Sequence, residues 1–189
     1  MLRKLLTGRK RTAQRKQPDA PAQHTDAAES IDLPFAIRPA TPADHAAIVR
    51  IFEDAIDGLA AEQYSARQRK AWKKTASLPA FRESLDEGIT LVAENAGQPI
   101  AFAQLHPSDY LRMLYVSADW SGLGISTLLY QYLEDEARIA GARTLVTDAS
   151  LRARRFFEQM GFSVSGEQKV KRQGVTLARL SMQKVLVKD

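Results

Sequence analysis

Two glycines stand at the expected start of a helix in the segment "WSGLGIS", residues 120–126. An apolar strand pattern ends just before this segment, and a helix pattern follows it at once. The first N–H groups of a helix lack intrahelical partners and carry the positive end of the helix dipole. Because glycine has no side chain to cover these groups, the junction can cradle the oxygens of a phosphate group. Tight turns also use paired glycines, so the motif alone leaves a plain turn as the alternative.

Several other kinds of chemistry are excluded or unexpected. The chain has no cysteine, which excludes disulfides, thiolate zinc sites and thiol nucleophiles. Its three histidines, His24, His45 and His106, are widely separated, so we expect no metal site. No apolar run approaches the roughly 20 residues that a membrane-spanning helix needs, so we expect a soluble, cytoplasmic protein.

The positive charge lies mainly at the N-terminus. Residues 1–30 hold seven of the 27 Lys and Arg and three of the 22 Asp and Glu, a net charge of +4. The other residues hold 20 basic and 19 acidic side chains, so the folded part shows no sign of a nucleic-acid-binding surface. Residues 1–33 are polar and contain two prolines, which predicts a disordered basic extension. As alternatives, this extension could contact nucleic acid or an anionic membrane, or it could be an organelle targeting peptide.

The positioning elements follow from periodicity and from turn residues over residues 34–189, which we predict to be one domain. We expect a helix capped by Thr41 and a second helix opened by a Ser65–Gln68 capping box. After residues 120–126, here called the glycine loop, one helix face should carry Ile125, Leu128, Leu129, Tyr132 and Leu133. Strands are predicted at residues 35–41, 110–117 and 143–149, and residues 89–107 should form a hairpin of two strands around a turn at Asn95 to Gln98. A helix is expected at 151–160, and two C-terminal strands should be joined near Gln173 and Gly174. The order βααββ–βα–βα–ββ predicts a mixed α/β sheet with helices on its faces.

Residues 35–186 resemble the GNAT acetyltransferase family. The motif of this family, Gln/Arg-x-x-Gly-x-Gly/Ala, falls on Ser121, Gly124 and Ser126, and a second signature falls on "ARRFFEQMGF", residues 153–162. The segment "YSARQRKAW", residues 64–72, is similar to the YSxxQxxAW helix of one bacterial branch. The resemblance implies a mostly antiparallel sheet of six to seven strands, helices on both faces, and a central strand pair that splays apart.

The resemblance also implies acetyl-CoA as co-substrate, with its pyrophosphate on the glycine loop and no metal. A backbone N–H near Tyr115 or Val116 would polarise the thioester carbonyl. The implied acetyl-CoA contacts are Tyr115, Val116, Ser121, Gly122, Leu123, Gly124, Ile125, Ser126, Ser150 and Phe157.

The sequence departs from the family pattern at three points. Ser121 replaces a Gln or Arg and removes a long hydrogen-bond donor, and Phe157 replaces a Tyr that can protonate the leaving thiolate. Arg112 stands where related sequences often carry an acid, so the nearby candidates for a general base are His106, Asp109 and Tyr110. A bound water that passes the proton to a remote group is the alternative. Tyr64 and Trp72 are expected to wall the acceptor pocket.

The expected function is an acetyl-CoA-dependent N-acetyltransferase, in which an amine attacks the thioester directly in a ternary complex. One alternative is a CoA-binding interaction module with little or no catalysis. A second is an RNA- or ribosome-associated acetyltransferase directed by the basic extension. The acceptor, a small molecule or a protein amine, and the oligomeric state remain open at this point.

Overall fold

The computed structural model describes residues 34–186, and the predicted N-terminal extension lies outside the described residues. This part of the chain contains one seven-stranded sheet with the order β1-β2-β3-β4-β5-β7-β6. The strands are β1 (Ala36–Pro39), β2 (Ile89–Asn95), β3 (Gln98–Leu105), β4 (Tyr110–Val116), β5 (Thr144–Ser150), β6 (Ser163–Arg172) and β7 (Val175–Val185). Neighbouring strands are antiparallel except β4 and β5, which are parallel. The predicted fold class, a mixed and mostly antiparallel sheet with helices, is confirmed.

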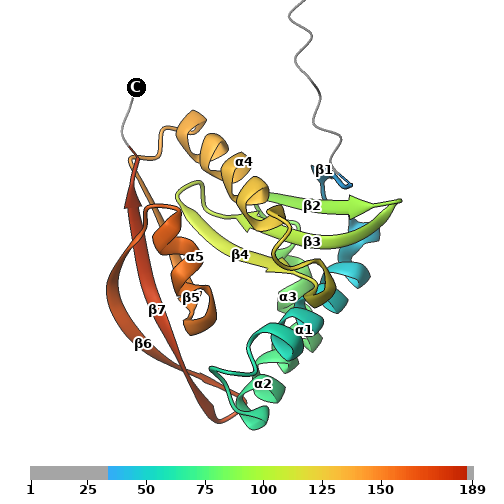
Figure 1. Ribbon diagram of the computed structural model, residues 1–189, viewed down its shortest axis with the longest axis vertical. Coiled ribbons are helices and arrows are strands. Elements are labelled where there is room, and N and C mark those ends of the chain that lie inside the picture. Colours follow the sequence, from blue (N-terminus) through green and yellow to red (C-terminus); the bar gives the residue numbers. More distant parts are fainter. Residues whose placement is uncertain (1–33, 187–189) are drawn as a thin grey trace, which may run out of the picture. The chain divides into compact units, whose positions relative to one another are not determined.

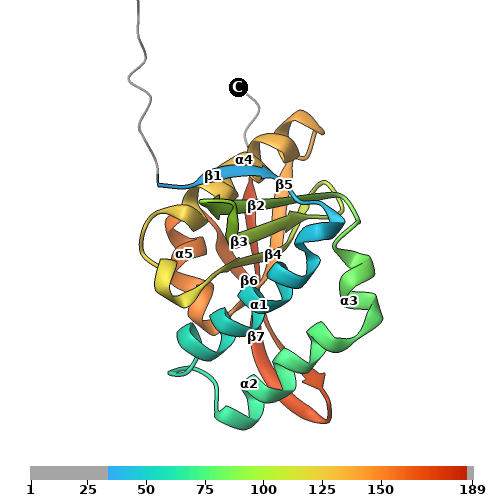
Figure 2. The ribbon, with the colours of Figure 1, turned by 90° about the vertical axis from the view of Figure 1, so that its right-hand side faces the viewer.

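Helices cover both faces of the sheet (Figures 1 and 2). One face carries α4 and α5, and the other carries α1, α2 and α3. The helices are α1 (His45–Leu59), α2 (Ala66–Lys73), α3 (Pro79–Ser84), α4 (Ile125–Ile139) and α5 (Arg154–Gln159), with short 3-10 turns η1 (Pro42–Asp44), η2 (Lys74–Ser77), η3 (Ala118–Trp120) and η4 (Leu151–Ala153). Because successive strand residues point to opposite faces, the sheet separates two main hydrophobic cores, one under α4 and α5 and one under α1.

The central strands β4 and β5 pair over a short stretch and then diverge. Their register includes only Tyr110 with Val146 and Leu111 with Thr147. The pairing of β4 with β3 shifts at the same point, which leaves Arg112 as an extra residue in β4. A β-bulge of this kind bends its strand and increases the local twist. The bulge therefore explains why β4 leaves β5 after Leu111, and it produces the splayed pair that the family resemblance implies.

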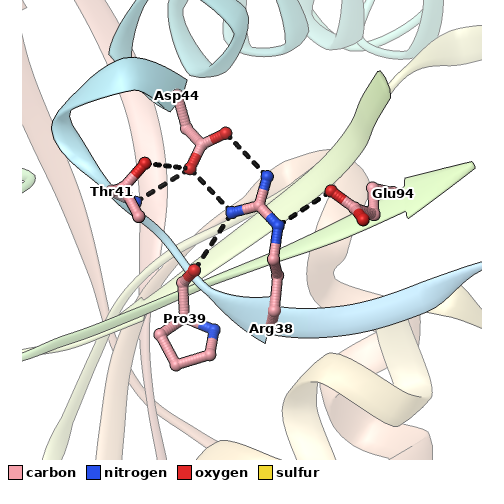
Figure 3. Close-up of polar contacts among 5 residues, drawn as sticks. All are labelled: Arg38, Pro39, Thr41, Asp44 and Glu94. Carbon is pink, nitrogen blue, oxygen red and sulfur yellow. Dashed lines mark hydrogen bonds and ion pairs between the residues drawn. The ribbon is translucent and has the colours of Figure 1, made fainter. Parts of the chain in front are cut away.

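The N-terminal strand is tied to its neighbours by a charged cluster around Arg38 (Figure 3). The guanidinium of Arg38, on β1, contacts Asp44 of η1 at 2.8 and 2.9 Å and Glu94 of β2 at 2.8 Å. Asp44 also accepts hydrogen bonds from the backbone N–H and hydroxyl of Thr41, which begins η1 as its predicted cap. The hydrogen bonds from Arg38 hold the pKa of Asp44 well below its usual value, although burial opposes this shift.

The predicted inner face of α4 is wrong at one position. Tyr132 is 54% exposed, whereas Tyr130 is almost fully buried. The buried stripe is rotated toward Tyr130 because Glu134 is also buried, where it pairs with Lys184 at 2.6 Å and with Arg138 at 2.7 Å. Burial raises the pKa of Glu134, but the hydrogen bonds from Lys184, Tyr130 and Arg138 outweigh it and hold this pKa below its usual value. A charged residue on the buried face is invisible to a hydrophobic pattern.

Within residues 34–186, none of the helices has the length and apolar character that crossing a membrane requires. The same residues contain no group of three or more His, Asp or Glu side chains arranged to hold a metal ion.

Candidate functional site

The glycine loop connects β4 to α4 through η3. Gly124 is the N-cap of α4 and has a φ of +80°, a left-handed conformation that favours glycine. A Cβ atom at Gly124 would meet no atom within 4 Å, so the space in front of the helix start is open. On the other side of the loop, α1 approaches so closely that a Cβ on Gly58 would lie 2.5 Å from the Cβ of Ala118. Asp54 of the same helix accepts a hydrogen bond from the Ala118 N–H at 2.7 Å, which fixes the loop against α1.

A cavity of about 240 Å³, here called the loop-side cavity, lies beside this loop. Most of the residues that sequence reasoning assigned to acetyl-CoA line it: Tyr115, Val116, Ser121, Gly122, Ser126, Ser150 and Phe157. The side chains of Leu123 and Ile125 do not, since Leu123 is 55% exposed and Ile125 is packed in the core. Gly124 contributes the start of α4 and not a cavity wall.

Phe157 is both a core residue and a wall of the loop-side cavity. Its side chain is buried and its ring lies 5.2 Å from those of Phe156 and Phe162. Phe157 therefore packs in the core and also lines the cavity, as expected of an acetyl-CoA contact. A tyrosine hydroxyl is missing at this point of the wall.

A smaller cavity of about 70 Å³, here called the gap, opens where β4 and β5 diverge. The backbone of β4 offers hydrogen-bonding groups to it. In an antiparallel ladder, residues bonded to the neighbouring strand alternate with residues whose N–H and C=O point the other way. The Ser117 N–H donates to the Ile100 carbonyl at 2.9 Å, so Tyr115, two residues earlier, also faces β3. The N–H groups of Leu114 and Val116 therefore point to the side from which β5 has departed.

A third cavity of about 190 Å³, here called the aromatic cavity, lies under α2 and the β6–β7 hairpin. Phe52, Tyr64, Trp72, Phe81 and Tyr115 give it aromatic walls. Trp72, Tyr115 and Ser150 line the aromatic cavity, the gap and the loop-side cavity alike. The three cavities consequently meet at the splayed strands, and a molecule in one can touch a molecule in another.

Asp148 organises the polar part of the aromatic cavity. One carboxylate oxygen accepts hydrogen bonds from Ser181 (3.0 Å) and Gln168 (3.2 Å). The other accepts from the Tyr110 hydroxyl (2.9 Å) and pairs with Arg179 (3.0 Å). Burial and the hydrogen bond to Asp148 raise the pKa of Tyr110 to about 12, so Tyr110 keeps its proton at neutral pH.

Tyr64 and Trp72 both line the aromatic cavity, and their rings are 5.3 Å apart. The Tyr64 hydroxyl accepts from the Leu151 N–H (2.9 Å) and donates to the Ala178 carbonyl (2.7 Å). Burial raises the pKa of Tyr64. Tyr64 thus ties the α1–α2 connection to η4 and β7, with its hydroxyl already occupied. The predicted capping box of the following helix is confirmed, because Ser65 and Gln68 bond each other's backbone N–H.

Of the three candidates for a general base from sequence, Tyr110 lines the aromatic cavity, whereas His106 and Asp109 line none of these three cavities. His106 faces Glu87 at 3.6 Å, and Glu87 also pairs with Arg112. Asp109 is exposed, and its backbone carbonyl accepts from the Val146 N–H at 2.9 Å. Both residues precede the point at which β4 and β5 separate, whereas the gap opens beyond it.

Sequence reasoning missed several polar residues at the cavities. Asp148 could have been found from alternation, because it lies two residues before Ser150 on the same face of β5. Arg152, on η4, lines the loop-side cavity, while Arg172 of β6 and Arg179 of β7 line the aromatic cavity. No local motif distinguishes these arginines from those on the surface.

Comparison with known proteins gives consistent matches. A family model described as "Acetyltransferase (GNAT) domain" matches residues 60–186. The chain is 29% identical over 146 residues to the uncharacterized N-acetyltransferase YafP of Escherichia coli (strain K12), covering 77% of this chain and 93% of YafP. A crystal structure of a GCN5-related N-acetyltransferase of Rhodopseudomonas palustris matches with a TM-score of 0.77 and 37% identity, over 80% of this chain and 95% of that one. The PaiA N-acetyltransferase of Thermoplasma acidophilum, solved in complex with coenzyme A, has the same fold, with a TM-score of 0.63 and 16% identity over 80% and 99% of the two chains.

Proposed function

Because this chain belongs to the GNAT family of acetyltransferases, we propose that it transfers the acetyl group of acetyl-CoA to an amine by direct attack in a ternary complex. The observation that supports this most is the meeting of the loop-side and aromatic cavities at the gap. Two substrates that enter from opposite ends can react there without a covalent enzyme intermediate. Holding them in contact makes the reaction effectively unimolecular, which is the main contribution expected from the protein.

The residues of the loop-side cavity fit the donor substrate. The start of α4, a helix of 15 residues, presents unpaired N–H groups, and the Cβ positions of Gly122 and Gly124 face open space. Arg152 adds a cation to this cavity, and the Ser121 and Ser126 hydroxyls add donors. These groups suit a pyrophosphate. PaiA of T. acidophilum holds coenzyme A in a fold of the same type.

The backbone of β4 suits the thioester. We propose that the N–H groups of Leu114 and Val116 replace the missing ladder bonds with hydrogen bonds to the donor substrate. One of them would polarise the thioester carbonyl and stabilise the negative charge that develops on its oxygen during attack. A backbone donor on a strand that is paired on its other side is well fixed for this purpose.

The amine must be neutral to attack. Burial among the aromatic rings of the aromatic cavity lowers the pKa of a bound ammonium group, which favours the neutral amine. As the C–N bond forms, the C–S bond breaks and sulfur leaves with its electron pair as a thiolate. The proton released by nitrogen can pass to the Tyr110 oxygen while Tyr110 gives its own proton to Asp148, to which it already donates at 2.9 Å. We therefore propose the Tyr110–Asp148 pair as the proton acceptor.

Phe157 cannot protonate the leaving thiolate, and this need not stop the reaction. A thiol with a pKa of about 8.5 is a tolerable leaving group near neutral pH, and solvent can return the proton. An acyl-enzyme route has little support. The chain has no cysteine, and the Ser150 hydroxyl caps η4 by accepting from the Ala153 N–H at 3.2 Å. No histidine lines the loop-side cavity, the gap or the aromatic cavity.

The segment around α2 favours one bacterial branch of the family. Tyr64, Ser65, Gln68, Ala71 and Trp72 match the YSxxQxxAW pattern. Tyr64 and Trp72 form one wall of the aromatic cavity, so we propose that this pattern belongs to the acceptor site of the branch.

Release of the CoA thiol in the presence of a panel of amines tests the proposal. We expect amine-dependent thiol release. When both substrates are varied, double-reciprocal plots of the initial rate against substrate concentration should give intersecting lines. Parallel lines together with an acetylated protein detected by mass spectrometry would instead support a covalent intermediate. Binding of acetyl-CoA without any amine-dependent release would favour the alternative of a catalytically inactive CoA-binding module.

A further inference from the structure

We infer that the acceptor is a small amine that also carries an anionic group, a carboxylate in the simplest case, and that Arg172 binds this group inside the aromatic cavity. The inference rests on the proposed acetyl transfer and names the class of its acceptor. It follows from the direction of one side chain, the pairing of its neighbours and the size of the cavity.

The alternation of β6 directs Arg172 inward. Along the second half of this strand, Gly166, Gln168, Val170 and Arg172 are partly buried, whereas Glu167, Lys169 and Lys171 are exposed. Successive strand residues point to opposite faces, so Arg172 shares the inner face with Val170 and Gln168. Val170 and Arg172 line the aromatic cavity, and Gln168 hydrogen-bonds Asp148 at its edge.

Arg172 differs in its pairing from the other two arginines of the cavity. Arg112 is neutralised by Glu87, and Arg179 by Asp148 at 3.0 Å. Within residues 34–186, the side chain of Arg172 has no hydrogen-bond or ion-pair partner. A guanidinium that is partly removed from water and has no counter-ion is unfavourable. The cavity therefore has an excess positive charge that an anionic ligand would neutralise, and a guanidinium fork suits the two oxygens of a carboxylate.

The position of Arg172 also orients the acceptor. The aromatic cavity shares Trp72, Tyr115 and Ser150 with the gap, whereas Arg172 belongs to the aromatic cavity alone. An acceptor with its amine at the gap therefore has its anionic group at Arg172. Between them it contacts the aromatic wall, in which Phe52 lies 4.8 Å from Tyr115 and 5.0 Å from Phe81.

The volume limits the size of the acceptor. At about 190 Å³, the cavity is smaller than the roughly 300–1,000 Å³ of pockets that hold drug-sized ligands. This volume suits a molecule of the size of an amino acid with an apolar side chain. The basic cavity and its aromatic wall thus favour amino-acid-like acceptors over polyamines, which carry only positive charge.

The test compares amino acids with their amides as acceptors, for example L-phenylalanine with L-phenylalaninamide and L-methionine with L-methioninamide. Each amide keeps the amine and the side chain but removes the anion. We expect the full-length protein to use acids with a kcat/KM at least 10-fold above that of the amides. In the Arg172→Gln variant the KM for acids should rise by about 10- to 100-fold, with little change in kcat and no change for amides. Arg172→Lys keeps the charge and should restore part of the loss.

Lys171→Gln provides the matched control, because it removes one positive charge from the exposed face of the same strand. This variant should have the same KM for acids as the unmodified protein. Calorimetric titration of the acids in the presence of CoA should show equal affinity for the unmodified protein and Lys171→Gln, and weaker affinity for Arg172→Gln. Amides used as well as acids, or acids unaffected by Arg172→Gln, would overturn the inference, as would no turnover of any acid while acetyl-CoA still binds. Absence of acetyl-CoA binding would instead refute the proposed function itself.

Discussion

Replacing Gly124 with glutamate introduces a carboxylate at the start of α4, where we propose that pyrophosphate oxygens bind. The fold should tolerate this change. A non-glycine residue at a φ of +80° costs about 1–2 kcal/mol, and a Cβ there meets no atom within 4 Å. An acidic side chain near a helix N-terminus contributes about 0.3–1 kcal/mol in return. We therefore expect a loss of about 1 kcal/mol in the free energy of unfolding.

Binding of acetyl-CoA should suffer far more. Two unit charges about 5 Å apart repel each other by about 3 kcal/mol at an effective dielectric constant of about 20. Since about 1.4 kcal/mol corresponds to a factor of ten, the dissociation constant should rise by about 100-fold or more. Isothermal titration calorimetry with acetyl-CoA measures this change directly, and denaturant unfolding measures the stability.

Two variants separate charge from strain. Gly124→Gln has nearly the same shape without the charge, so it should bind acetyl-CoA much better than Gly124→Glu. Gly141→Glu places the same side chain at a φ of +85° just beyond the opposite end of α4, also facing open space, and should leave affinity unchanged. Equal affinity of Gly124→Glu and the unmodified protein would refute the phosphate cradle.

Four further predictions concern other residues. Ser121→Arg adds a charge-assisted contact at the loop-side cavity and should tighten acetyl-CoA binding by about 3- to 10-fold, more at low salt, as measured by calorimetry; equal affinity at every salt concentration would show that residue 121 does not face the ligand. Tyr110→Phe removes the proposed proton route and should lower kcat by about 100-fold with little effect on KM, whereas His106→Ala should keep its activity. The reverse result would assign the role of proton acceptor to His106. Tyr64→Phe leaves the Leu151 N–H and the Ala178 carbonyl without their partner and should lower the free energy of unfolding by about 2 kcal/mol in urea; an unchanged midpoint would contradict this role. The pKa of Asp44 is lower in the folded state than its ordinary value of 3.8, so ionised Asp44 stabilises the fold above pH 3.8. This contribution is lost as the pH falls toward the pKa of the folded state. Asp44→Asn should therefore flatten the dependence of thermal stability on pH below about 4.

Local signals in the sequence predicted much of the fold. The Ser65–Gln68 capping box, the hairpin turn between β2 and β3 and the turn at Gln173 and Gly174 lie where short-range hydrogen bonding and backbone freedom require them. These features depend on a few neighbouring residues, which is why a single sequence can reveal them. Tyr132 was misplaced because the burial of Glu134 depends on Lys184, 50 residues away in the chain.

The candidate site was predicted unevenly for a related reason. The glycine loop is contiguous, so its residues could be recognised together. The polar group around Asp148 joins β4, β5, β6 and β7, and no spacing in the sequence brings Tyr110, Gln168 and Arg179 to one carboxylate. The bulge at Arg112 decides where the gap opens, and nothing in "YLRMLYV" distinguishes a bulged strand from a regular one. His106 and Asp109 were chosen for their nearness in sequence to β4, whereas the strands separate only after Leu111.

The short contact between β4 and β5 bears on how the domain unfolds. Two residue pairs join the β1–β4 part of the sheet to the part formed by β5, β7 and β6, so the backbone ladder couples the two halves weakly. Tyr64 adds a link from the α1–α2 connection to β7 and η4. A molecule that fills the gap and bonds to both strands would act as a further link, stabilising the folded state by an amount that grows with its concentration relative to its dissociation constant. Occupancy of the gap would therefore strengthen the coupling between the two halves, which in the empty domain rests mainly on their shared hydrophobic core under α4 and α5.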